Sequence, residues 1–259
     1  MIWPNGNARM SRDGLAAFGR AVAFFAAALL LAGADSARAA SFIIDPLKVS
    51  LNEAQASTVM RVQNTGKDTL TLQIQPRSWQ QESKADRLEP TRELVATPQI
   101  FRIKPGATQL VRVALLGKAD AQRETAYRLV FDEIPAPPAA DFVGVQVAMR
   151  VTIPLFVSPK KTAKSGLRVS VKASDNDKLL IVAENQGNAH AHLKKLLFAR
   201  EGDETAPPVE IETPAYLLAG TTREFIVTRP QGRLDSLEKL SIKAIGMTGA
   251  VEFDGLAQP

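Results

Sequence analysis

The chain has 259 residues, a length that suits one large domain or two small ones. It contains no cysteine, which excludes disulfide bonds, thiol catalysis and cysteine-ligated metals. The net charge of +5 is too small an excess to indicate a nucleic-acid-binding protein.

The first 39 residues have the pattern of a secretory signal peptide. An apolar run at 21–32 follows three arginines, which are Arg9, Arg12 and Arg20. The run is too short to span a bilayer comfortably, and Ala37-Arg38-Ala39 after it matches an A-x-A cleavage site. A translation start at Met10 would keep this pattern. We therefore expect a mature chain that begins at Ala40, is located in the periplasm and is not embedded in a membrane.

Short alternating stretches follow the leader, separated by turn residues about every ten positions. The expected strands are 42–51, 56–64, 70–74, 99–103, 109–115, 126–134 and 143–153. Pro46 cannot donate a ladder hydrogen bond, so we expect it at a sheet edge or a bulge. Trp79 is expected in the core, and the polar segment 80–89 is expected to be a loop. This pattern predicts a β-sandwich.

A second set of short strands follows a basic linker at 159–166. The expected strands are 167–171, 179–184, 191–198, 215–218, 224–228, 240–245 and 250–253. They predict a smaller second sandwich and an all-β fold class overall. The expected division is a signal peptide at 1–39, a first domain at 40–158 and a second domain at 159–259.

The stretch Val143–Ile153 has the clearest alternation in the chain. Its odd positions carry an apolar ridge, which consists of Val143, Val145, Val147, Met149 and Val151, whereas its even positions are small or polar. Because successive side chains of a strand point to opposite faces, this predicts one long strand with one apolar face. Two interpretations remain open. The stretch is either a half-buried strand of an antiparallel sheet or a strand whose ridge is offered to another protein.

Catalytic or metal-binding motifs are not evident in this sequence. His190 and His192 are the only histidines, and their i, i+2 spacing on a strand would allow a metal pair. No third ligand lies near them in the sequence, so a surface or turn role is expected for both. A Gly-rich phosphate loop and a G-x-S-x-G nucleophile elbow are also missing. We therefore expect no enzymatic activity, no metal and no cofactor.

Five stretches, in the right order, resemble the periplasmic pilus chaperones of the chaperone–usher pathway, the PapD-like family. They are Phe42–Leu51, the strand from Pro105-Gly106 to Arg112-Val113, Arg123-Glu124 with Glu133-Ile134-Pro135, Val145–Val157, and the turn Asn185–His190. Together they span nearly all of the chain after the leader. The resemblance implies two immunoglobulin-like β-sandwich domains set at an angle, with a cleft between them. The departures from the family pattern favour a divergent or archaic-type member.

The resemblance also implies a function for the apolar ridge. Chaperones of this family lend a strand to pilus or fimbrial subunits that lack their last strand, and they deliver the subunits to an outer-membrane usher. The residues implied for this donor strand are Val143, Val145, Val147, Met149 and Val151. Pilus subunits and the usher are thus the expected partners, nucleic acid is not, and self-association of the free protein remains an open alternative.

In this family, two basic residues hold the C-terminal carboxylate of the bound subunit. The first of these positions falls on Lys48, whereas the second falls on Pro154, which carries no charge. Arg112 and Arg150, on neighbouring predicted strands, are the candidate replacements, and Arg123 is a weaker one. Two further departures are Arg128 and Val130, which stand where the family usually has an aromatic residue and an asparagine.

Two rival functions remain. The first is a secreted structural protein with two immunoglobulin-like domains, such as an adhesin or a pilus subunit. A subunit would carry its own N-terminal donor arm, whereas this chain begins a strand soon after the leader. The second is an exported binding module or enzyme built on a sandwich, which the missing catalytic motifs disfavour. Genes for an usher barrel and small subunits beside this one would separate these alternatives.

Overall fold

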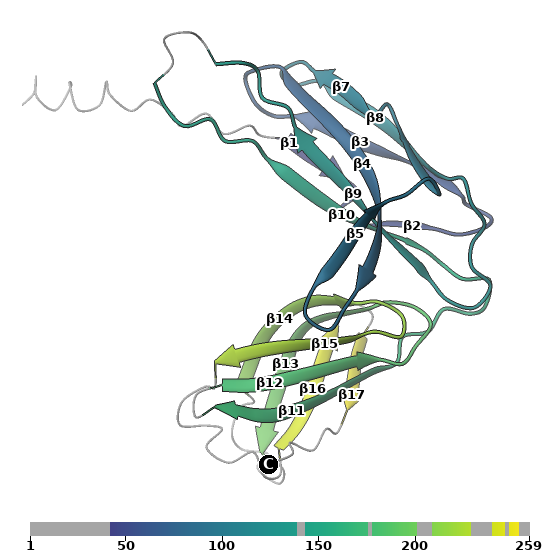
Figure 1. The fold of residues 1–259 in the computed structure, drawn as a ribbon, viewed down its shortest axis with the longest axis vertical. Coiled ribbons are helices and arrows are strands. Elements are labelled where there is room, and N and C mark those ends of the chain that lie inside the picture. The colour runs from purple at the N-terminus through teal and green to yellow at the C-terminus, as the bar shows by residue number, and fades with distance from the viewer. Residues whose placement is uncertain are drawn as a thin grey trace, which may run out of the picture. The chain divides into compact units, whose positions relative to one another are not determined.

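The computed structural model describes residues 42–138, 143–175, 178–200, 209–228, 240–246 and 249–253. Every regular element in these ranges is a β-strand (Figure 1). The expected signal peptide at 1–39 lies outside the described residues. Among the residues that are described, no helix has the length and apolar character needed to cross a membrane.

The first sandwich consists of two sheets built from β1 to β10. One sheet has the order β1 (Phe42–Asp45), β3 (Ser57–Asn64), β8 (Thr108–Leu115) and β6 (Leu94–Thr97). The other has the order β2 (Val49–Leu51), β10 (Arg150–Val157), β9 (Thr125–Glu133), β4 (Leu70–Gln81) and β5 (Asp86–Pro90), with β7 (Ile100–Ile103) also paired to β4. Their inner faces share one core, which includes Met60, Val62, Leu72, Ile74, Val111, Val113, Leu129, Phe131, Ile153 and Leu155.

Alternation in the sequence explains why these strands form a sandwich. In β3, the exposed residues Val59 and Arg61 alternate with Met60 and Val62, which are fully buried. Each such buried side chain contributes roughly 1.5–3 kcal/mol to folding. Asn64 ends the strand on the buried face, and its Nδ2 donates to the carbonyls of Asp68 at 2.7 Å and Ile103 at 2.9 Å. These bonds offset the cost of burying the amide.

The second sandwich is built from β11 to β17. A three-stranded sheet has the order β11 (Leu167–Asp175), β12 (Lys178–Asn185) and β15 (Thr222–Thr228). A four-stranded sheet has the order β14 (Val209–Leu217), β13 (Ala191–Arg200), β16 (Leu240–Gly246) and β17 (Gly249–Phe253). Their core includes Val171, Leu179, Ile181, Leu193, Leu196, Phe198 and Leu217. The predicted all-β class and sandwich architecture are therefore confirmed for the described residues.

Two predicted elements of the first sandwich were wrong in detail. The stretch 42–51 is not one strand, because the chain passes from one sheet to the other at Pro46 and forms β1 and β2. The segment 80–89 is not a loop. It contains the turn of a hairpin whose strands β4 and β5 pair from Arg77 opposite Pro90 to Gln81 opposite Asp86. The paired parts of both strands are mostly polar, which is why the hydrophobic pattern did not indicate the hairpin.

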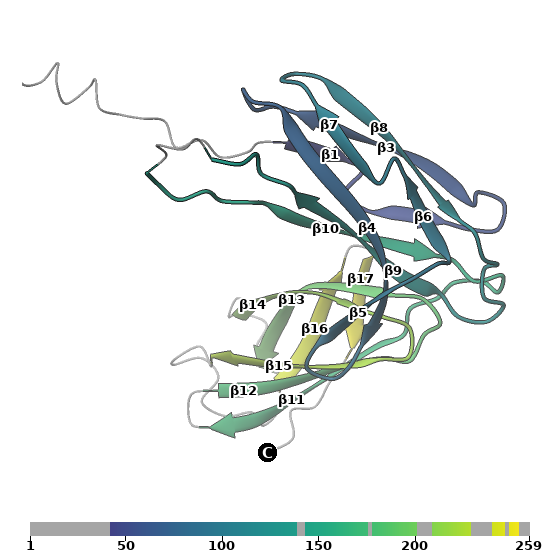
Figure 2. The same ribbon diagram turned by 45° about the horizontal axis from the view of Figure 1, so that its top comes forward.

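The outer face of the six-stranded sheet contacts the second sandwich through what we call the junction cluster: Trp79, Ala126, Phe156, Tyr216 and Leu218. Trp79 is only 3% exposed, as predicted, but it lies in this cluster and not in the core of the first sandwich. The β4–β5 hairpin lies beside the second sandwich (Figure 2), where the backbone N–H of Glu224 donates to Ser83. The Gln81 side chain bonds the backbone of both Tyr216 and Leu218.

Candidate functional site

Strand β10 has one sheet edge that is only partly used. It pairs antiparallel with β9 along its whole length, from Arg150 to Val157. On its other edge it pairs with β2 in parallel, but only from Leu155 to Val157. Among the described residues, no strand covers this edge between Arg150 and Pro154. Backbone groups on an uncovered edge can bond an added strand.

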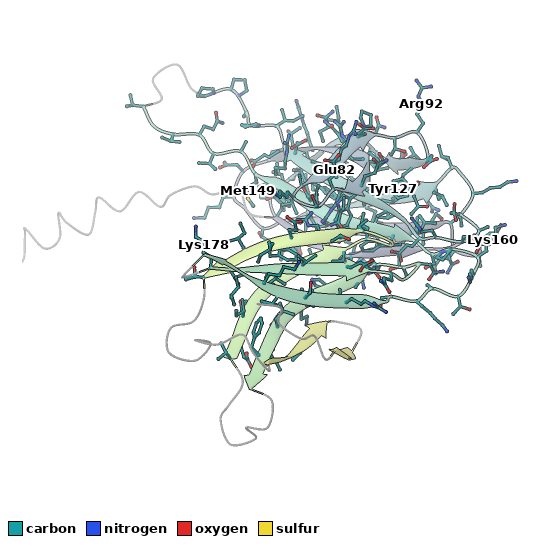
Figure 3. All side chains as sticks on the ribbon, turned by 60° about the horizontal axis from the view of Figure 1, so that its bottom comes forward. Glu82, Arg92, Tyr127, Met149, Lys160 and Lys178 are labelled. Atoms are coloured by element: carbon teal, nitrogen blue, oxygen red, sulfur yellow. The ribbon has the colours of Figure 1, made fainter. Side chains whose placement is uncertain are left out.

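The segment before β10 corrects the predicted strand boundary. The strand was expected to begin at Val143, whereas β10 begins at Arg150. The reason is that a strand is defined by its ladder, and residues 143–149 have no strand beside them in the described part of the chain. The segment is held to the end of β9 by a bond from the N–H of Glu133 to the carbonyl of Met149, at 2.9 Å. Figure 1 shows it running beyond the first sandwich, and Figure 3 labels Met149 on it.

The apolar ridge divides into an exposed part and a part at the core. Val143, Val145 and Val147 are 98%, 87% and 70% exposed, and Met149 is 37% exposed. Val151 is half-buried against the core, and Ile153 on the same face is 1% exposed. The exposed side chains therefore continue a row that is buried further along the strand.

Lys48 lies between β1 and β2, where the chain crosses from one sheet to the other. It is exposed, and within the described ranges it has no ion-pair partner. Its positive charge contributes to the lowered pKa of His192 in the second sandwich. The pKa of His192 is held below its ordinary value by burial first, and then by the charges of Lys194, His190 and Lys48.

The structure does not bring the two arginine candidates to Lys48. Arg112 lies on the exposed face of the four-stranded sheet, paired in register with Val59 on β3. Arg150 lies at the start of β10 and forms an ion pair with Asp132. The weaker candidate Arg123 lies beside Gly220 of the second sandwich.

Sequence reasoning missed a cation that lies next to Pro154. Arg128 on β9 is the cross-strand neighbour of Pro154. Its guanidinium lies 3.5 Å from the centroid of the Trp79 ring and 3.9 Å from Asp86. Burial lowers the pKa of Arg128, and the charge of Asp86 acts in the opposite direction. The register of β9 against β10 is the signal that could have identified this residue.

His190 lies in the turn between β12 and β13, within the expected surface or turn role, whereas His192 lies on β13, and both rings are half-buried. His190 stacks on Phe156 at 3.6 Å between ring centroids, and His192 stacks on Tyr216 at 4.1 Å. Nδ1 and the backbone N–H of His190 both contact Oε1 of Glu124, at 2.8 and 2.9 Å. The sequence did not indicate this stacking, because the partners of both rings come from distant strands. In the described part of the chain, no group of three or more acidic or histidine side chains could hold a metal ion.

The first sandwich is similar to a known family of pilus-assembly chaperones. Residues 41–163 match the family model described as the PapD N-terminal domain of pili and flagellar-assembly chaperones. The uncharacterized fimbrial chaperone YbgP of Escherichia coli strain K12 is 30% identical over 149 residues, which are 56% of this chain and 57% of YbgP. The chain thus matches little more than half the length of that relative.

Two solved structures share the fold at low sequence identity. One is a chain of the CsuC–CsuE chaperone–tip adhesion subunit pre-assembly complex from archaic chaperone–usher Csu pili of Acinetobacter baumannii. It has a TM-score of 0.60 and 23% identity, and the match covers 83% of this chain and 96% of that one. The other, from the Salmonella enterica SafA pilin in complex with the SafB chaperone, has a TM-score of 0.56 and 14% identity, covering 84% and 96%.

Proposed function

We propose that the chain is a PapD-like periplasmic chaperone for pilus or fimbrial subunits, because residues 41–163 match the N-terminal domain model of that chaperone family. It completes a subunit's unfinished sheet with the segment that begins at Val143, and it delivers the subunit to an outer-membrane usher. The proposed chain organisation is a leader at 1–39, a chaperone domain at 40–158 and a second domain at 159–259.

One observation carries this proposal: the apolar ridge is exposed where the edge of β10 is uncovered. Val143, Val145 and Val147 repeat every second residue, the spacing that places side chains in successive pockets of one sheet face. Natural sheets usually protect such an edge with charge or proline. Arg150 and Thr152 carry polar groups, but they belong to the opposite face. An added strand from a partner would cover both the backbone edge and the ridge.

The energies are sufficient for stable capture. Full burial of each ridge side chain is worth roughly 1.5–3 kcal/mol. Each ladder hydrogen bond adds roughly 0.5–1.5 kcal/mol. Association costs an estimated 4–15 kcal/mol before any affinity remains. The free energy from burying four ridge residues and from the ladder hydrogen bonds therefore exceeds the lower estimates of the association cost.

The charged part of the site combines Lys48 with Arg128. Lys48 occupies the position that the family resemblance assigns to the first carboxylate anchor. Arg128 is the cross-strand neighbour of Pro154, which occupies the second anchor position. We propose that Arg128 takes this role in preference to Arg112 and Arg150, because those two arginines lie on another sheet and at the far end of β10.

The decisive experiment is Val147→Glu, measured by thermal unfolding and by co-purification with a subunit encoded beside this chain. Val147 is 70% exposed, so we expect a near-native midpoint together with loss of the subunit. Leu110→Glu is the matched control, because Leu110 is 54% exposed on the other sheet. Unfolding of the Val147 variant, or subunit loss in both variants, would contradict the proposal.

The anchor is tested separately by Lys48→Ala. Removing a cation that pairs with a desolvated carboxylate costs roughly 2–5 kcal/mol of binding. We expect a folded protein that loses most of its subunit, whereas Lys104→Ala, the loss of another exposed lysine, should bind normally. If Lys48→Ala retains the subunit at the wild-type yield, Lys48 is only a surface residue.

A further inference from the structure

The segment before β10 runs opposite the residues that follow β9, although the two do not form a ladder. The ladder of β9 and β10 begins with Arg150 opposite Asp132. The same register continues one residue further, because the backbone N–H of Glu133 donates to the carbonyl of Met149 at 2.9 Å. Strand β10 nevertheless begins only at Arg150, so a local feature must stop the ladder there.

That feature is the side chain of Glu133. In an antiparallel ladder, the two residues at a hydrogen-bonded position exchange both of their N–H···O bonds. Glu133 and Met149 make the first of these bonds through the backbone, but the N–H of Met149 donates to Oε2 of the Glu133 side chain, at 3.0 Å. The carboxylate therefore takes the place of the Glu133 carbonyl. A bond to an ionised acceptor is also stronger than one to a neutral acceptor.

Proline occupies the next two hydrogen-bonded positions opposite the segment. Continuing the register places Pro135 opposite Val147 and Pro137 opposite Val145. A proline has no N–H and cannot donate to the strand beside it. The sequence after β9 therefore prevents a full ladder with the segment that carries the apolar ridge.

A second side chain replaces part of the missing ladder. Gln146 falls opposite Ala136 in the continued register, and its Nε2 donates to the carbonyl of Ala136 at 2.8 Å. Gln146 belongs to the polar face of the segment, so this bond does not involve the apolar ridge. Glu133 and Gln146 thus hold the segment at two points, while the valines of the ridge remain exposed.

The two adjacent carboxylates at the end of β9 have different partners. Asp132 forms an ion pair with the side chain of Arg150, which is largely exposed. Glu133, which is half-buried, binds the backbone of Met149 instead. Only Glu133 therefore acts directly on the path of the main chain.

We propose that Glu133 is a positioning residue for strand lending, whose carboxylate holds the ridge-bearing segment extended at the point where it leaves β9. This inference rests on the proposed function and deepens it. A segment already held in its bound conformation loses less conformational entropy when a partner strand pairs with it. Backbone groups of successive residues point to opposite edges of a strand, so those of Ala148 and Arg150 point away from Glu133, to the uncovered edge.

The test has two readouts on the whole protein: hydrogen exchange of the Met149 amide, and the affinity for a purified subunit encoded beside this chain. Glu133→Ala removes the acceptor. We expect the amide to exchange about tenfold faster and the subunit to bind about tenfold more weakly, the effect of one charge-assisted bond. Glu133→Gln keeps an oxygen at the same place and should restore most of both.

Asp132→Ala is the matched control. It removes the neighbouring carboxylate and the ion pair with Arg150, but it keeps the acceptor of the Met149 amide. Because an exposed ion pair contributes little, both readouts should change less than about twofold. Thermal midpoints of all three variants should stay close to that of the wild type.

Three outcomes would overturn the inference: wild-type subunit affinity of Glu133→Ala, equal losses in the Glu133→Ala and Asp132→Ala variants, and a Glu133→Gln variant as weak as Glu133→Ala. Unfolding of Glu133→Ala beside a folded, fully active Glu133→Gln would assign the side chain a structural role and also overturn it. The proposed function is judged separately by Val147→Glu. If that variant loses the subunit while Glu133→Ala keeps it, only the role of Glu133 fails.

Discussion

Strand β10 and the segment before it share one apolar alternation but have opposite surroundings. Ile153, Leu155 and Val157 are at most 1% exposed, because the four-stranded sheet covers them. Val143, Val145 and Val147 continue the same row, yet they are largely exposed. The difference teaches that alternation specifies which side chains share a face. It does not specify whether this chain or another molecule supplies the second layer.

Hydrogen exchange should show the largest contrast between these two regions. Amides of 151–157 that bond within the sheet should exchange only through extensive opening, several orders of magnitude more slowly than free peptide. Amides of 143–148 should exchange at nearly the free-peptide rate. Addition of a subunit should protect the second group. Protection of 143–148 in the isolated monomer would show that the chain covers this segment by itself.

Alanine substitutions should separate the regions by stability. Leu155→Ala removes a fully buried side chain and should lower the free energy of unfolding by about 2–5 kcal/mol. Val147→Ala should change it by less than about 0.5 kcal/mol, because little of that side chain is buried. Urea unfolding measures both. Equal losses would mean that the apolar ridge is part of the core.

A smaller effect is expected where the β4–β5 hairpin meets the second sandwich. The Gln81 side chain accepts from the N–H of Leu218 and donates to the carbonyl of Tyr216, both at 2.8 Å. Gln81→Ala leaves these backbone groups without partners and should cost about 1–3 kcal/mol. Amide exchange in 143–148 should not change, since Gln81 lies on β4, which is not paired with β10. A change there would mean that the two regions are coupled.

The smallest effect should come from pH. Burial, followed by the charges of Lys194, His190 and Lys48, lowers the pKa of His192, so the folded state favours the neutral ring. The stability that the neutral ring contributes is fully present above about pH 6.5, the ordinary pKa of histidine. It is lost as pH falls through the lower pKa of the folded state. Thermal midpoints should drop between pH 7 and 5, and His192→Gln should drop less. An equal drop would exclude His192 as the cause.

The sequence was sufficient to predict most strands and their inward faces. In β3, β8 and β9 an apolar residue recurs at every second position, and this pattern indicates the fold class. The hairpin at 80–89 was not predicted, because hydrogen bonds of polar side chains, and not a pattern of apolar residues, stabilise it. Gln81 has no apolar signal, and its partners lie more than a hundred residues further along the chain.

The candidate site was only partly readable from the sequence. The apolar ridge and Lys48 could be identified from alternation and from the family resemblance. Arg128, His190 and His192 could not, because their positions depend on which rings pack against them. Trp79, Phe156 and Tyr216 come from three separate strands, β4, β10 and β14, and no local pattern indicates that they meet.

The parallel pairing of β2 with β10 also determines when folding can finish. Val49 lies near the start of the described chain, and its partner Leu155 follows roughly a hundred residues later. When the N-terminus emerges first, β2 waits without a neighbour while the strands between them assemble. Such distant pairing slows folding, because a long loop must close before the contact forms. Strand β10 joins β2 in the same late step, so the uncovered sheet edge at Arg150–Pro154 is formed only when the first sandwich is finished.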